Sequence, residues 1–146
     1  MIRGTREAVI PTILVVDDDP YVRQLVRDIL EFEGYLVDTA NDGASALVSI
    51  GLSRPDCVVL DVMMPGLSGH SVLAKLREAD EPDRPLPVVM LTAAVDPAEV
   101  WQAWAGGVDY FLAKPFDPSE LLRYLDDLFS GGPAPRRPHG ARAERC

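Results

Sequence analysis

Residues 13–20 read ILVVDDDP, and this stretch decides the fold of the chain. Four consecutive apolar residues without polar alternation are typical of a strand that is buried on both faces, as in a parallel sheet. The run leads directly into Asp17, Asp18 and Asp19, and Pro20 then suits the first turn of a helix. We therefore interpret the stretch as a buried strand that ends in an acidic turn and leads into a helix.

The same pattern of an apolar run followed by helical spacing recurs along the chain. Further apolar runs lie at residues 57–60, 87–91 and 110–112, and a weaker run at 35–37 fits an edge strand. The apolar spacing predicts helices over residues 20–33, 43–50, 68–79, 97–105 and 118–129. Strand and helix alternating five times predict an α/β fold with a five-stranded parallel sheet, doubly wound, with helices on both faces.

The first expected helix shows the spacing most clearly. Its apolar residues recur every three or four positions and are predicted to form one core-facing stripe, made of Val22, Leu25, Val26, Ile29 and Phe32. Asp19 is expected to cap this helix, because an aspartate before a proline favours a helix start.

The length of 146 residues allows one domain with one core. We assign residues 11–130 to this domain, residues 1–10 to an N-terminal extension, and residues 131–146 to a disordered tail rich in proline and arginine. The chain carries a net charge of −9; the tail contributes +3 and the extension +1, which leaves −13 on the domain. An acidic domain repels nucleic acid backbones, so we expect no direct DNA binding.

The chain is expected to be cytoplasmic. No apolar run approaches the roughly 20 residues that cross a bilayer, so we expect no membrane association. The N-terminus lacks the pattern of a signal peptide, because Pro11 interrupts its apolar stretch and acidic residues follow. The two cysteines, Cys57 and Cys146, are placed unfavourably for a disulfide, which fits a reducing compartment.

Polar side chains follow four of the predicted strands. Asp17 and Asp18 follow the first, Asp61 the third, Thr92 the fourth, and Lys114 the fifth. Ligands of doubly wound sheets bind beyond the carboxyl ends of the strands, so these side chains are expected to converge. Crowded carboxylates favour a hard divalent cation such as Mg²⁺. An aspartate can attack phosphorus when the phosphoryl charge is neutralised, and a lysine and a threonine suit the phosphoryl oxygens.

Four segments at these strand ends resemble the receiver domain of two-component response regulators. They are residues 13–20, 59–69 (VLDVMMPGLSG), 90–93 (MLTA) and 107–116 (GVDYFLAKPF). The gaps from Asp17 to Asp61, Thr92 and Lys114 are successively 44, 31 and 22 residues, and the resemblance covers about residues 11–130. One motif alone would be weak, but four in order at fitting spacings are specific. The chain is most similar in plan to single-domain, chemotaxis-regulator-like members.

The resemblance implies a (βα)5 flavodoxin-like fold and a function in signalling. It implies that Asp61 accepts a phosphoryl group from a sensor histidine kinase, with Thr92 and Lys114 on the phosphoryl oxygens. It implies Mg²⁺, for which Mn²⁺ or Ca²⁺ can substitute, bound by Asp17, Asp18, Asp61 and the backbone carbonyl of Met63. It also implies a cis peptide between Lys114 and Pro115.

The resemblance further implies a switch in which Thr92 moves toward the phosphoryl group and an aromatic side chain turns inward. The aromatic position falls on Phe111, where many members have tyrosine, so the chain keeps the packing and lacks the hydroxyl. The expected partners are a sensor histidine kinase or phosphotransfer protein, a downstream protein target, and a second copy through the fourth helix, fifth strand and fifth helix. One of Trp101 and Trp104 is expected to lie exposed on that surface as an anchor.

Two other functions remain open from the residues. A Mg²⁺-dependent phosphatase or phosphomutase with an aspartyl-phosphate intermediate usually carries its nucleophile after the first strand in an Asp-x-Asp pattern, which Asp17 to Asp19 contains. The short chain offers no cap domain for such an enzyme. The third reading, a receiver that is never phosphorylated, conflicts with the complete set of site residues. The favoured reading is therefore a phosphoacceptor domain and not a turnover enzyme.

Overall fold

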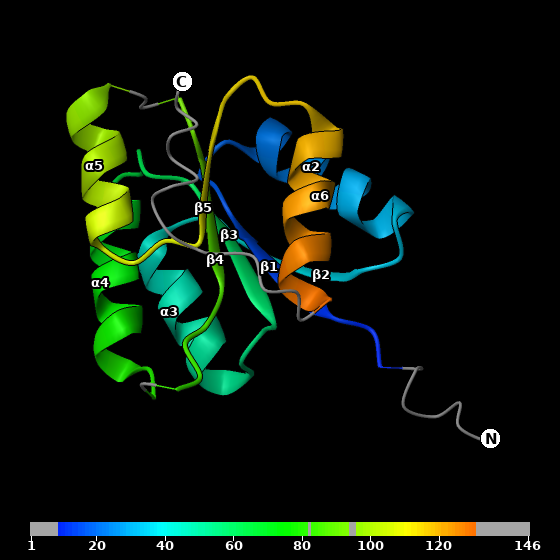
Figure 1. Cartoon of the computed structure of the whole chain (residues 1–146), viewed down its shortest axis with the longest axis horizontal. Coiled ribbons are helices and arrows are strands. Elements are labelled where there is room, and N and C mark those ends of the chain that lie inside the picture. The colour runs from blue at the N-terminus through cyan, green and yellow to red at the C-terminus, as the bar shows by residue number, and fades with distance from the viewer. Residues whose placement is uncertain (1–8, 82, 94–95, 131–146) are drawn as a thin grey trace.

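Strands and helices alternate along the chain as the sequence predicts (Figure 1). The structure is a computed structural model that describes residues 9–81, 83–93 and 96–130. The predicted tail and most of the predicted N-terminal extension lie outside the described residues. The strands are β1 (Thr12–Val16), β2 (Leu36–Ala40), β3 (Cys57–Leu60), β4 (Val88–Thr92) and β5 (Tyr110–Ala113). The helices are α2 (Pro20–Phe32), α3 (Gly43–Leu52), α4 (Gly69–Ala79), α5 (Pro97–Ala105) and α6 (Pro118–Phe129).

All five strands form one parallel sheet in the order β2-β1-β3-β4-β5. The register aligns the carboxyl ends, because Val16 pairs with Leu60 and Thr92 pairs with Ala113. In the order of the strands, β2 lies beside β1 toward one edge of the sheet, and β3 lies beside β1 toward the other edge. This reversal creates the crevice at which doubly wound sheets place their ligands.

The sheet separates α3, α4 and α5 on one face from α2 and α6 on the other (Figure 1). An apolar layer fills the space between the sheet and the helices on each face. One layer contains Ala46 from α3, Val72 from α4 and Ala103 from α5, packed on the sheet. The other contains Val26 from α2 and Leu121 from α6. Helices on both faces confirm the doubly wound arrangement. None of the helices in the described part of the chain is long and apolar enough to cross a bilayer.

Two details differ from the sequence prediction. Tyr110 and Phe111 are only half-buried, because β5 lies at the edge of the sheet. In α2 the buried residues are Val26 and Leu30, whereas Leu25 is exposed and Phe32 is 93% exposed. The apolar stripe of α2 is wider than the side that the sheet covers, so these two side chains lie on its flank.

Candidate functional site

Four strands bring the predicted site residues to one edge of the sheet. Asp17 follows β1, Asp61 follows β3, Thr92 ends β4 and Lys114 follows β5. Asp17, Asp61 and Thr92 are the buried polar residues within the described ranges, with exposed fractions of 3%, 5% and 0%. Carboxylates are rarely buried because they lose hydration, so two buried carboxylates at one edge of the sheet indicate a functional cluster.

Backbone contacts hold Asp61 in place. Its amide donates to the carbonyl of Val16 at 3.0 Å, which ties β3 to β1 at the edge of the sheet. The amide of Gly69, the first residue of α4, donates to the carbonyl of Val62 at 2.8 Å. A Cβ at Gly69 would overlap the backbone of Asp61 and lie 2.8 Å from the Cα of Val62. Glycine therefore permits the close approach of α4 to the loop that carries Asp61.

Lys114 bridges the carboxylates of two strands. Its Nζ donates to Asp17 Oδ2 at 2.9 Å and lies 3.5 Å from Asp61 Oδ2. Its amide donates to the carbonyl of Thr92 at 2.9 Å. The peptide between Lys114 and Pro115 is cis, as the resemblance implies.

The neighbours of Asp61 do not fully compensate the negative charge of its ionised carboxylate. Burial and the negative charge of Asp17 raise the pKa of Asp61, and they outweigh the opposing effects of Lys114, of the Thr92 hydroxyl and of the Met63 amide. Burial acts to lower the pKa of Lys114, but the hydrogen bond to Asp17 and the charge of Asp61 raise it overall. The lysine therefore stays cationic, while ionised Asp61 lacks full compensation for its lost hydration.

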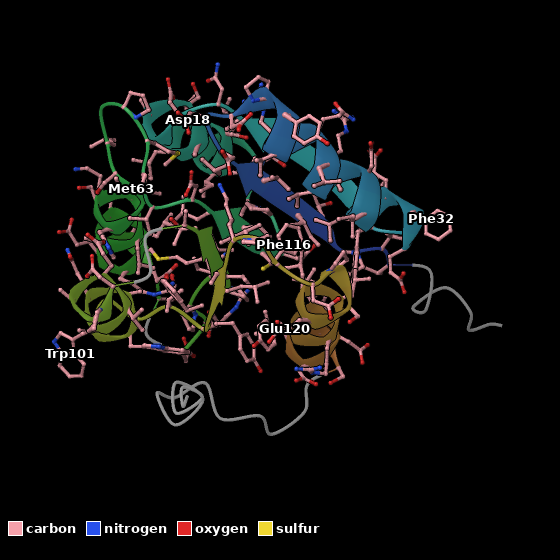
Figure 2. All side chains as sticks on the ribbon, turned by 90° about the horizontal axis from the view of Figure 1, so that it is seen from above. Asp18, Phe32, Met63, Trp101, Phe116 and Glu120 are labelled. Carbon is pink, nitrogen blue, oxygen red and sulfur yellow. The ribbon has the colours of Figure 1, made fainter. Side chains whose placement is uncertain are left out.

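The acidic side chains fit a divalent cation. One carboxylate oxygen from each of Asp17, Asp18 and Asp61 lies within 4.8 Å of the other two. Asp18 is exposed, so this cluster opens to solvent on one side (Figure 2). An all-oxygen set with access for water suits Mg²⁺, which retains part of its water shell, and equally Mn²⁺ or Ca²⁺. Met63 follows Asp61 by two residues and its side chain is 62% exposed.

The third aspartate of the acidic turn has a different role. Asp19 caps α2, and its carboxylate accepts from the amide of Tyr21 at 2.9 Å. Its own amide donates to Asp17 Oδ1 at 2.9 Å. The predicted cap is confirmed. It uses the carboxylate of Asp19, which is the second aspartate of the Asp-x-Asp pattern in the phosphatase alternative.

Sequence reasoning missed one residue that shapes the acidic turn. The guanidinium of Arg23, on the first turn of α2, donates to the carbonyl of Asp17 at 2.8 Å. Its position one helical turn after Asp19 is the signal in the sequence that could have indicated this contact.

The aromatic residues divide between core and surface. Phe111 and Trp104 are half-buried and pack against the apolar layer beneath α3, α4 and α5. Trp101 is 70% exposed and projects outward from α5 (Figure 2). The expectation of one packed and one exposed tryptophan is confirmed.

A groove that the sequence did not indicate begins beside Lys114. It runs between α2 and the start of α6, and its lining is almost wholly apolar: Val22, Leu25, Ile29, Ala93, Pro115, Phe116 and Pro118. A second hollow shares Ile29 and Pro118 and continues to Phe32 and Leu122. In Figure 2, Phe116 lies near the centre of the molecule, and Phe32 projects from the outer edge of the molecule at the end of α2. The feature of the sequence that could have indicated this groove is the number of apolar residues in α2, which exceeds what one core stripe holds.

Comparisons with known proteins agree with this geometry. The family model described as the response regulator receiver domain matches residues 13–126. The response regulator MprA of Mycobacterium ulcerans is 46% identical over 116 residues, which cover 80% of this chain and 49% of that protein. The corresponding protein of Mycobacterium sp. strain KMS is 47% identical, with coverages of 80% and 49%. The chain thus spans about half the length of the curated relatives it matches.

Solved structures show the same fold. The chemotaxis protein CheY4 of Vibrio cholerae matches with a TM-score of 0.75 and 33% identity, over 82% of this chain and 99% of that one. A putative response regulator from Chloroflexus aurantiacus matches with a TM-score of 0.76 and 33% identity, over 84% and 99%. These likenesses confirm the predicted flavodoxin-like receiver fold.

Proposed function

The chain belongs to the response regulator receiver family, and from this premise we propose that Asp61 is its phosphoryl-accepting residue. The observation that carries the proposal is the setting of Asp61: a 5% exposed carboxylate at the end of a central strand, 3.5 Å from the Lys114 ammonium and beside Asp17 and Asp18. Receiver domains are signalling domains, so phosphorylation at this residue would be the input of a switch.

The donor in this proposal is a phosphohistidine on a sensor histidine kinase or a phosphotransfer protein. An Asp61 oxygen forms a bond to phosphorus while the bond from phosphorus to the histidine nitrogen breaks, and the imidazole leaves with the electron pair. Lys114 already lies between the carboxylates and is positioned to shift its charge toward a phosphoryl oxygen. The Thr92 hydroxyl is positioned to donate to another oxygen, because it already hydrogen-bonds Asp61.

We assign the metal to Asp17, Asp18, Asp61 and the backbone carbonyl of Met63. A bound divalent cation would neutralise charge on the phosphoryl oxygens. The proposal is supported by the all-oxygen donor set and by the uncompensated charge that raises the pKa of Asp61. Asp18, which is exposed, would offer its carboxylate to the cation from the solvent side.

The switch in this proposal links the new charge to Thr92 and Phe111. A phosphoryl group adds about −1.5 to −2 charges and strong hydrogen-bond acceptors, which attract the Thr92 hydroxyl. Movement at the end of β4 changes the room available to Phe111 on the neighbouring strand, whose register partner is Met90. The surface formed by α5, β5 and α6, with the exposed Trp101, would present the result to a downstream protein or a second copy.

The apolar groove between α2 and α6 is where we place the phosphoryl donor. It opens beside Lys114 and carries Leu25 on its rim, so a helix docked there would hold a phosphohistidine within reach of Asp61. The low charge of its lining matches the apolar face of such a helix. A cytoplasmic location belongs to the same proposal, because phosphohistidine formation draws on ATP.

A labelling experiment tests the assignment of Asp61. The chain is incubated with Mg²⁺ and a small-molecule phosphodonor, such as acetyl phosphate, and its intact mass is measured. We expect the wild type to gain the mass of one phosphoryl unit and Asp61→Asn to gain none. Asp19→Asn is the matched control, because asparagine retains the helix cap and the adjacent site stays intact. Equal labelling of the wild type and Asp61→Asn would refute the assignment.

A further inference from the structure

The side chain of Arg23 reaches back from α2 to the acidic turn that carries the proposed metal ligands. Its backbone is fixed by the helix, because its amide donates to the carbonyl of Asp19 at 2.9 Å. Its guanidinium donates from Nη1 to the carbonyl of Asp17 at 2.8 Å. The arginine is half-buried, and a charged donor that is partly removed from water makes a stronger hydrogen bond than a neutral one. The contact therefore ties α2 to the acidic turn at Asp17.

Every polar group of Asp17 is engaged in the described structure. Its amide donates to the carbonyl of Ala40 at 3.3 Å, which joins the end of β1 to β2. Its Oδ1 accepts from the amide of Asp19 at 2.9 Å, and its Oδ2 accepts from Lys114 at 2.9 Å. The remaining polar group of Asp17 is the backbone carbonyl, and Arg23 holds it.

The carbonyl of Asp17 belongs to the peptide group that also contains the amide of Asp18. A peptide group is planar, so a hydrogen bond to its oxygen fixes the orientation of the whole plane and the direction in which the next residue leaves it. Asp18 is the exposed member of the cluster formed with Asp17 and Asp61. Few neighbours constrain an exposed side chain, so the place of this carboxylate depends on the backbone that carries it.

The charge of Arg23 and its hydrogen bond have opposite effects on a bound cation. A positive charge beside the acidic turn repels a divalent cation, and this effect alone makes the arginine unfavourable for metal binding. The hydrogen bond instead holds the peptide that presents Asp18, which favours metal binding. Removal of the arginine side chain should therefore tighten binding if the charge dominates and weaken it if the hydrogen bond dominates.

We propose that Arg23 is a positioning residue for the divalent cation, because it fixes through the carbonyl of Asp17 the peptide that presents the Asp18 carboxylate. This inference rests on the metal assignment made under the proposed function. Residues that hold metal ligands in place typically contribute about 10-fold to 100-fold to metal affinity. The loss of one hydrogen bond behind an exposed ligand belongs at the lower end of that range.

Titration of the amide NMR signals with Mg²⁺ tests this role without phosphorylation. Arg23→Met removes the hydrogen-bond donors and keeps most of the apolar stem, and it should raise the dissociation constant for Mg²⁺ about tenfold. Arg23→Lys retains the charge and a donor, so its affinity should lie between those of Arg23→Met and the wild type. Arg27→Met is the matched control: it removes the same charge one turn further along α2, where the arginine pairs with Glu31 at 3.1 Å. This control should bind Mg²⁺ at least as tightly as the wild type.

The rate of labelling by acetyl phosphate separates metal binding from the chemical step. In Arg23→Met, the Mg²⁺ concentration that gives half the maximal rate should rise by the same factor as the dissociation constant. The rate at saturating Mg²⁺ should match the wild type, because Asp61, Thr92 and Lys114 are unchanged. An affinity of Arg23→Met equal to or higher than that of the wild type would overturn the role of Arg23. An affinity for Mg²⁺ that Asp18→Asn leaves unchanged would instead overturn the metal assignment, and this inference with it.

Discussion

At the scale of single residues, the ionised form of Asp61 opposes folding. Burial and the charge of Asp17 raise its pKa in the folded state above its value in the unfolded chain. The folded state therefore binds the proton more tightly. The contribution of Asp61 to the free energy of unfolding falls as pH rises through the interval between the two pKa values, and this loss persists at neutral pH.

Asp61→Asn is accordingly expected to stabilise the metal-free protein at neutral pH, by roughly 1 kcal/mol. Asparagine keeps the size of the side chain and cannot ionise. Urea unfolding of both proteins, without divalent cations and from about pH 4 to about pH 7, measures the difference. The stability gap should widen as pH rises, because the other titrating groups are shared. A gap that narrows with rising pH would show that the Lys114 contact outweighs the burial of the charge.

At the scale of elements, α4 approaches the loop that carries Asp61 closely at Gly69. A Cβ at Gly69 would overlap the backbone of Asp61, which cannot move aside as a side chain tip can. Gly69→Ala is expected to lower the free energy of unfolding by about 1–3 kcal/mol, the range for overpacking, and to slow labelling by acetyl phosphate. Urea unfolding and the rate of mass gain measure the two effects.

Gly51→Ala is the matched control for this prediction, because a Cβ there meets nothing within 4 Å. It should leave labelling unchanged and raise stability by about 0.4–1 kcal/mol, since alanine restricts the unfolded chain. If both substitutions had the same effect on stability, the close approach of α4 would not explain the glycine at position 69.

If the phosphoryl donor protein docks in the groove between α2 and α6, a charge on this groove should affect transfer from a protein donor but not from a small molecule. Leu25→Asp places a charge on its apolar rim at an exposed position, so the fold should persist. Transfer from a cognate phosphohistidine protein should fall at least about tenfold, equivalent to about 1.4 kcal/mol, while labelling by acetyl phosphate stays unchanged. Leu52→Asp makes the same change on α3, across the sheet, and should leave both rates unaltered. A parallel loss of both reactions in Leu25→Asp would assign the effect to the site itself and not to docking.

At the scale of the whole molecule, metal binding and folding are linked. The acidic cluster exists only when β1 and β3 lie side by side, so a cation bound there stabilises the folded chain. At about 100 times its dissociation constant, Mg²⁺ is expected to raise the free energy of unfolding by about 2.7 kcal/mol. Thermal unfolding with increasing Mg²⁺ measures this increase.

Asp18→Asn separates this effect from general screening of the acidic chain. Asp18 is exposed, so the metal-free variant should resemble the wild type and lose most of the increase with Mg²⁺. Asp38→Asn, at an exposed aspartate of β2, should retain it. An equal increase in all three proteins would point to screening and remove the assignment of the cation to this cluster.

The sequence by itself determined the fold and the membership of the cluster. The runs 13–16 and 57–60 have no polar alternation, so they can only be buried, and parallel strands must end at one edge. Asp17, Asp61, Thr92 and Lys114 follow such strands directly, which made their convergence predictable. The cap at Asp19 was equally local, because it depends on the proline that follows.

Only the tertiary structure decided which apolar side chains remain on the surface. Leu25 and Phe32 fit a core stripe by spacing, but Val26 and Leu30 occupy the sheet face and leave the other two beside α6. Likewise, Val48 and Leu52 are apolar residues of a short helix until the packing of Ala46 shows which side of α3 faces outward. The physical reason is that spacing along a helix constrains which residues share a side, whereas the neighbouring elements determine which side is buried.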